Sequence, residues 1–127
     1  MITENYISFE TAKLLKEKGF DEATLCDYSN KGTRWFNDVL VQHNSQGGIA
    51  CPTLQMVMKW LREVHDIFIE LTVGETNGKT WYDFDIIPIN KREIAWNHYD
   101  NLPFVECNSY EQACEAAIQY CLKNLIQ

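Results

Sequence analysis

The sequence predicts an α+β fold in which an antiparallel sheet, built from two hairpins, carries helices packed mainly on one face. Two observations predict it. Apolar residues recur at helical spacing in three stretches, at about 8–18, 52–65 and 109–126. Turn residues separate β-prone runs in two others, at about 23–36 and 67–89. The 127 residues contain no linker or repeat, so we expect a single globular domain over 1–127.

The first helix is predicted from its two ends and its apolar side. Ser8 is a typical N-cap residue, and Gly19 is a typical residue after a helix C-terminus. Between them, the less polar side chains cluster on one side of the helix: Thr11, Ala12, Leu14 and Leu15.

The first hairpin is predicted from its turn. The letters SNKG at 29–32 supply the Asn and Gly of a turn between two β-prone runs. The stretch that follows, 37–51, has no clear period, and neither it nor 91–108 is assigned an element.

The stretch PTLQMVMKWLREVH, 52–65, raises the question of whether this helix fills a core or contacts nucleic acid. Near its N-terminal end, Gln55 and Lys59 are the side chains that could reach base edges. Its apolar arc covers roughly 200°, about twice what a surface helix needs. We therefore expect it to fill a core, with Trp60 buried against the sheet. The arc comprises Leu54, Met56, Val57, Met58, Trp60, Leu61 and Val64.

The second hairpin can be tested against its own pattern. If Asn77-Gly78 forms a two-residue type I′ turn, facing residues have numbers that sum to 155. This register pairs apolar side chains on one face and polar side chains on the other, as expected for a sheet with one core face. The apolar pairs are Val73 with Tyr82, Leu71 with Phe84, and Ile69 with Ile86; the polar pairs are Thr72 with Asp83 and Glu70 with Asp85.

The last helix begins with a capping-box pattern, in which Ser109 is the N-cap and Gln112 follows three residues later. Helical spacing predicts a broad inward face made of Tyr110, Ala113, Cys114, Ala117, Tyr120, Cys121 and Leu125.

Charge and cysteine content limit the partners and the compartment. Eleven Lys and Arg against eighteen Asp and Glu give a net charge of −7, which repels phosphate, so nucleic acid is not the expected partner. The start, MITENYISFE, lacks the features of a signal peptide, and no apolar run reaches membrane length. Five cysteines without a C-x-x-C motif fit reduced thiols. We expect a cytoplasmic protein that does not contact a membrane.

One candidate site for chemistry is the polar face of the second hairpin. Glu70, Asp83 and Asp85 would lie there together, with Glu70 directly opposite Asp85. Paired carboxylates can bind Mg²⁺ or Ca²⁺, or act as acid and base. A solvated acidic face is the alternative that we prefer, because no further ligand or Gly-rich ion loop accompanies them.

Cys51 is the second candidate. It precedes Pro52 at the N-terminus of the 52–65 helix, where the helix dipole lowers a thiol pKa. His43, His65 or His98 would have to serve as its base, but none has informative spacing, and a buried, unreactive cysteine is preferred. Zinc-site spacings and known catalytic motifs are absent, so neither a metal nor a cofactor is expected.

Three blocks carry a resemblance: ENYISFETAKLLKEKGFDE (4–22), PTLQMVMKWLREVHDIFIE (52–70) and SYEQACEAAIQYCLKNLI (109–126). Together they resemble a family of small uncharacterised proteins encoded by phages and prophages of Bacteroides-type gut bacteria. The resemblance implies a cytosolic product of a mobile element. It implies no activity and no catalytic residues.

Three functions remain as hypotheses. The preferred one is a non-enzymatic protein that binds another protein through an aromatic and acidic surface, with self-association into a homo-oligomer as a further expectation. The absence of a catalytic motif and the aromatic residues in strands or loops, such as Trp35, Trp81 and Trp96, favour it. The second is a small enzyme that uses the acidic cluster or Cys51. The third is a winged-helix-like nucleic-acid binder, with 52–65 as reader and 74–80 as wing; it would need Lys59, Arg62 and Lys79 on one side.

Overall fold

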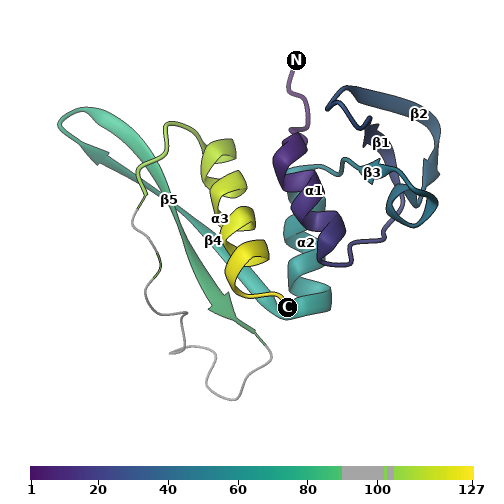
Figure 1. The fold of residues 1–127 in the computed structure, drawn as a ribbon. Coiled ribbons are helices and arrows are strands. Elements are labelled where there is room, and N and C mark those ends of the chain that lie inside the picture. The colour runs from purple at the N-terminus through teal and green to yellow at the C-terminus, as the bar shows by residue number, and fades with distance from the viewer. Residues whose placement is uncertain (90–101, 103–104) are drawn as a thin grey trace. The chain divides into compact units, whose positions relative to one another are not determined.

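The structure is a computed structural model that describes residues 1–89, 102 and 105–127. Its described helices and strands follow in chain order (Figure 1): α1 Phe9–Glu17, β1 Thr24–Tyr28, β2 Arg34–Val41, the 3₁₀ turn η1 His43–Gln46, β3 Ile49–Ala50, α2 Leu54–His65, β4 Ile67–Thr76, β5 Lys79–Pro88 and α3 Tyr110–Asn124. The predicted α+β class is confirmed.

The hairpins, however, form two sheets and not one. Within the described ranges, one sheet has the strand order β2-β1-β3, and β4 pairs with β5 in a second sheet of two strands. The chain divides into two compact units, one formed by Met1–Leu54 with Gln119–Gln127 and the other by Gln55–Ile118. The sheets belong to different units, because β1 to β3 lie in the first and β4 with β5 in the second.

In the first unit, α1 begins as predicted. The Ser8 hydroxyl accepts a hydrogen bond from the Thr11 N–H at 3.2 Å, and Gly19 follows the helix with φ +92°, a left-handed conformation that suits glycine. Thr11, Ala12 and Leu15 are buried. α1 contacts β3, the short strand at one edge of the three-stranded sheet.

The first hairpin has an irregular register. Cys26 pairs with Phe36 and Thr24 pairs with Val41, so four residues of β2, 37–40, lie opposite the single residue Leu25 of β1. Such an insertion disrupts the ladder and bends the longer strand. It also explains why the segment from 37 onward has no sequence period, since side chains in a bulge do not alternate between two faces.

The second hairpin confirms the predicted register. All five predicted pairs face each other, and Asn77 and Gly78 have φ of +53° and +79°, as a type I′ turn requires. The expected core face is buried only near the base of the hairpin, at Ile69, Phe84 and Ile86. Towards the turn Val73 is 63% exposed, so the prediction of a continuous apolar core face is wrong at this end.

Near the same turn, a tryptophan lies over a glycine. Gly74 pairs with Trp81 across the hairpin, and a Cβ atom at Gly74 would lie 2.1 Å from Trp81 Cζ2. The Trp81 indole N–H also donates to the Thr76 hydroxyl at 3.0 Å. The ring therefore occupies the space that any other residue at position 74 would need.

The α2 helix fills a core, as its broad apolar arc predicts. Leu54, Val57, Met58, Trp60 and Leu61 are buried, and Val57 and Leu61 are fully so. Two residues of the arc are more open than predicted: Met56, at one edge of the arc, is 38% exposed, and Val64, within the arc but in the last turn of the helix, is 55% exposed. The inward face is thus narrower than the sequence indicates.

The α3 helix has the predicted cap. The Gln112 N–H donates to the Ser109 hydroxyl at 3.1 Å, and the Gln112 side chain accepts from the Asn108 N–H at 3.0 Å. Its inward face is shifted from the prediction, because Tyr110 is exposed while Ile118 and Leu122 are fully buried. Four residues are buried as predicted: Ala113, Cys114, Ala117 and Cys121.

None of the helices in the described ranges is long and apolar enough to cross a membrane.

Trp60 has 6% of its surface exposed, so Trp60→Ala should remove a large part of the packing around α2. We expect the free energy of unfolding to fall by about 3–5 kcal/mol in chemical denaturation followed by circular dichroism. Val64→Ala, at an exposed position in the last turn of the same helix, is the control and should cost less than about 1 kcal/mol. Similar losses for the two variants would contradict the burial argument.

Gly74→Ala should displace the Trp81 ring and destabilise the hairpin by about 1–3 kcal/mol. In a Trp81→Thr background the space is free, and Gly74→Ala should be nearly neutral or stabilising, since glycine weakens a strand. A double-mutant cycle of unfolding free energies measures the difference. Equal effects of Gly74→Ala in both backgrounds would show that the ring does not determine the residue at position 74.

Candidate functional site

The predicted acidic cluster lies on the second hairpin. Glu70 and Asp85 face each other in the register, and Asp83 lies two residues before Asp85 on the same strand. Asp85 Oδ1 accepts from the Ile86 N–H at 2.8 Å. Asp83 Oδ1 accepts from the Phe84 N–H at 2.8 Å and from the Val105 N–H at 3.4 Å. Both aspartates thus hold the backbone around them.

The contact to Val105 has a structural role. Just beyond it, Tyr82 and Cys107 exchange two backbone hydrogen bonds, of 2.9 and 2.8 Å, so the chain before α3 runs along β5. Asp83 reinforces this pairing. No group of three or more His, Cys, Asp or Glu side chains within the described ranges is arranged to hold a metal ion.

Cys51, the predicted nucleophile, is fully buried. Its thiol contacts the Ile7 carbonyl oxygen at 3.9 Å, and burial raises the pKa of the thiol, although Cys26, Tyr28 and Arg34 beside it oppose that shift. A raised pKa depletes the thiolate that would act as nucleophile. The burial therefore works against the lowering that a helix N-terminus provides.

The histidines considered as its base have other surroundings. His98 lies outside the described residues. The ring of His65 stacks edge-on against Trp60, with centroids 4.6 Å apart, in the other unit of the chain. His43 is buried, and its ring lies beside Asp27 and Asn37. Neither His43 nor His65 therefore lies beside Cys51 as a base.

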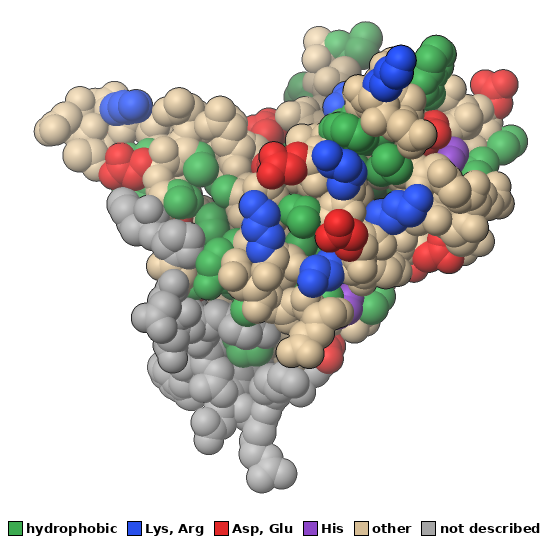
Figure 2. Space-filling view, viewed as in Figure 1, with side chains coloured by type: hydrophobic (Ala, Val, Ile, Leu, Met, Phe, Trp, Pro, Cys, Tyr) green, Lys and Arg blue, Asp and Glu red, His purple; other side chains and the backbone are tan. Residues whose placement is uncertain are grey.

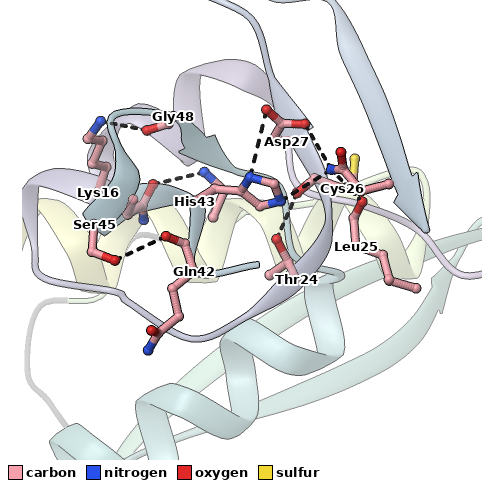
Figure 3. A network of polar contacts seen from close by, with 12 residues as sticks. Lys16, Thr24, Leu25, Cys26, Asp27, Gln42, His43, Ser45 and Gly48 are labelled. Carbon is pink, nitrogen blue, oxygen red and sulfur yellow. Dashed lines mark hydrogen bonds and ion pairs between the residues drawn. The ribbon is translucent and has the colours of Figure 1, made fainter. Parts of the chain in front are cut away.

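His43 is the centre of a polar cluster that the sequence does not reveal (Figure 3). Asp27 Oδ2 lies 3.8 Å from His43 Nδ1, and the Asn37 amide lies 3.3 Å from His43 Nε2. The same amide donates to the Leu25 carbonyl at 3.1 Å and lies 3.3 Å from Asp27 Oδ1. Strand β1, the bulge of β2 and the turn η1 thus meet at one imidazole.

The backbone around His43 is held as firmly as its ring. The Gly48 N–H donates to the His43 carbonyl at 2.8 Å, and the Lys16 ammonium donates to the Gly48 carbonyl (Figure 3). Asn44 bridges two elements: its amide donates to the Phe20 carbonyl at 2.7 Å, and its oxygen accepts from the Ala50 N–H at 2.8 Å. Side-chain hydrogen bonds therefore order the segment for which the sequence predicts no element.

This cluster has part of the geometry of an acid–base site but lacks a nucleophile. A carboxylate at Nδ1 orients a histidine so that Nε2 can accept a proton. Here the Asn37 amide occupies Nε2, which leaves no position for a Ser, Thr or Cys nucleophile at this nitrogen. The arrangement fixes the position of β2 and η1. Sequence reasoning could not find it, because residues 27, 37 and 43 follow no motif.

Beyond the N-terminal residues Met1 and Ile2, exposed apolar side chains are most numerous on β2. Trp35, Phe36, Val39 and Leu40 are between 59% and 65% exposed, and Leu25 beside them is 46% exposed. Seven of the eight residues of the strand are exposed. In Figure 2, hydrophobic side chains reach the surface in the region that β2 occupies in Figure 1. Single exposed apolar residues are ordinary, but several large ones on one short strand make β2 a candidate interaction surface.

We compared the chain with known protein families, curated proteins and solved structures. No family model, no curated protein and no solved structure matches the chain.

His65 supplies a test by pH. Burial lowers the pKa of His65, the charge of Asp66 opposes this only in part, and the buried Nε2 has no hydrogen-bond partner in the described part of the chain. A lowered pKa in the folded state means that the unfolded chain binds the proton more tightly, so stability is lost as the pH falls below about 6.5. We expect denaturation midpoints to fall between pH 7.5 and 5.5, and His65→Gln to reduce that fall. An identical pH dependence in the variant would contradict this assignment.

Proposed function

We propose that the protein is a non-enzymatic binding protein that takes up an extended segment of another protein chain beside β2. The observation that carries the proposal is the run of exposed apolar side chains on this strand, Trp35, Phe36, Val39 and Leu40. Side chains of this kind dominate the energetics of protein interfaces, because they bury a large area and lose little conformational entropy.

The position of β2 in its sheet supports the same proposal. It is an edge strand, with β1 on one side and no strand on the other within the described residues. An edge strand offers unpaired N–H and C=O groups to which an extended peptide can add.

The hydrogen bonds of β1 indicate which backbone groups these are. The Cys26 carbonyl accepts from the Cys51 N–H at 3.0 Å, so the backbone groups of Cys26 face β3. The pair of Cys26 with Phe36 is then a non-hydrogen-bonded pair, and the N–H and C=O of Phe36 point to the open edge. A segment docked there would bond to the backbone at the position where an exposed aromatic ring stands.

The aromatic ring of Phe36 is held in place before any partner arrives. It meets the Tyr6 ring edge-on, with centroids 5.4 Å apart, and the Arg34 guanidinium lies over Tyr6 at 5.4 Å and over Tyr28 at 5.5 Å. The Tyr28 hydroxyl in turn accepts from Arg34 at 2.9 Å. Ordering a side chain in advance reduces the entropy that binding must overcome.

The enzyme hypothesis has less support, since Cys51 is buried and both aspartates of the acidic cluster bond to backbone. For the winged-helix hypothesis, Gln55 and Lys59 are exposed, but the Gln55 amide donates to the Tyr110 hydroxyl at 3.2 Å. The suggested origin from a phage or prophage stays a prediction based on resemblance.

Selection from a library of displayed linear peptides tests the proposal without a known partner. We expect enrichment of peptides with alternating large apolar residues, and at least a tenfold loss of their affinity for Trp35→Ser/Phe36→Ser. Val73→Ser, at an equally exposed position on the other hairpin, is the matched control and should bind as the parent does. N-methylation of alternate peptide bonds should weaken binding, since it removes the donors that an added strand needs.

Failure to enrich any peptide, or enriched peptides that bind Trp35→Ser/Phe36→Ser as tightly as the parent, would contradict the proposal. Self-association of the parent that the same double substitution abolishes would show instead that a second copy of the chain occupies β2. Circular dichroism must show that the variants stay folded, which we expect because both side chains are exposed.

A further inference from the structure

Two cysteines from distant parts of the sequence lie opposite each other in the first unit. β1 pairs with β3 so that Asp27 faces Ala50 and Tyr28 faces Ile49. One step further along this register, Cys26 faces Cys51, and the Cys51 N–H donates to the Cys26 carbonyl at 3.0 Å. Directly opposed residues of an antiparallel pair project to the same face of the sheet, so both thiols lie on one side.

The spacing of such a pair suits a disulfide. Cα atoms of a hydrogen-bonded antiparallel pair lie about 5.5 Å apart, within the roughly 4.4–6.8 Å that disulfides span. Burial raises the pKa of Cys26 to about 12, and a hydrogen bond with Cys51 contributes to that shift.

We propose that Cys26 and Cys51 form an intramolecular disulfide when the protein is exposed to a peroxide. The bond would join β1 to the chain just before α2 and close a loop that contains all of β2 and the His43 cluster. This proposal does not rest on the proposed function. The two cysteines lie where β1 meets β3, whereas the proposed function concerns β2 at the other edge of β1.

The order of the chemical steps follows from the surroundings of each thiol. Burial raises the pKa of both thiols, but at Cys51 hydrogen bonds with Cys26 and Tyr28 and the charge of Arg34 oppose the rise, so Cys51 is the more easily deprotonated of the two when the site opens. Cys51 therefore reacts first. Its thiolate attacks one peroxide oxygen, the O–O bond breaks, and Cys51 becomes a sulfenic acid as hydroxide leaves and takes up the proton lost by the thiol.

The second step uses the neighbouring thiol. The sulfur of Cys26 attacks the sulfur of the Cys51 sulfenic acid, the S–O bond breaks, and the hydroxyl leaves as water with the proton of Cys26. Overall, two thiols lose two protons and two electrons, and one hydrogen peroxide is reduced to two waters. Both thiols are buried, so the rate should follow local opening of β3, which has only two residues.

The other cysteines provide the controls. Cys114 and Cys121 are buried on α3, seven positions apart, which is about 10.5 Å along a helix and too far for a disulfide. Cys107 is the one cysteine that is not fully buried, and it would form bonds between molecules. Replacing it with serine removes that side reaction without touching the pair.

The experiment treats Cys107→Ser with hydrogen peroxide and maps the product without reduction by mass spectrometry. We expect the loss of two hydrogen masses, a linked peptide that joins Cys26 to Cys51, and return of both thiols on treatment with a thiol reductant. Oxidation should raise Tm by several degrees, as closing a loop of this length does. Cys107→Ser/Cys114→Ser/Cys121→Ser should give the same linked peptide.

Cys26→Ser in the same background should stop at the sulfenic acid of Cys51, which dimedone traps. The proposal is overturned if Cys26 and Cys51 remain free thiols at peroxide levels that oxidise Cys107 in the parent. It is equally overturned if they reach sulfinic acid without forming a linked peptide. The mapping in Cys107→Ser requires no change at the pair, so the test holds even if Cys26→Ser fails to fold.

Discussion

The first unit depends on β1, the strand that carries pairing on both of its sides. Its five residues hold β2 along one edge and β3 along the other. Thr24, Cys26 and Tyr28 are buried on one face, and the Tyr28 hydroxyl donates to the Ile7 carbonyl at 2.6 Å, which ties in the chain before α1. Removing this strand would leave β2 and β3 without their shared partner in the sheet, and the N-terminal segment without the hydrogen bond from Tyr28.

The two faces of β1 have different roles because side chains alternate along a strand. On the buried face, Cys26 meets Cys51, and Tyr28 bonds to Ile7 and Arg34. On the other face, Asp27 stands beside His43 and Asn37, which holds the bulge of β2 against the turn η1. The short strand β1 thus positions both the pair of Cys26 with Cys51 and the polar cluster at His43 that supports β2.

Charge is distributed unevenly between the two units. The first contains six Lys and Arg and seven Asp and Glu, and the second contains five and eleven, so nearly all of the net charge of −7 belongs to the second. The proposed contact of a protein segment with β2 would therefore take place on a nearly neutral unit, where net charge imposes little repulsion. The acidic hairpin is a poor surface for phosphate for the same physical reason.

The sequence by itself determined the features that depend on neighbours along the chain. Ser8 and Ser109 cap their helices, and Asn77-Gly78 sets a register that pairs Glu70 with Asp85, because caps and two-residue turns act within a few residues. The broad apolar arc of α2 likewise predicted that this helix fills a core.

Only the tertiary structure decided which of the apolar residues are covered and which distant residues meet. Val64, Val73 and Tyr110 follow the apolar pattern but are exposed, since burial requires a partner surface that local spacing does not specify. The separation of the hairpins into two sheets, the cluster at His43 and the approach of Cys26 to Cys51 all arise from pairings across long stretches of chain. Local preferences cannot select these, because each depends on strands brought together by the fold as a whole.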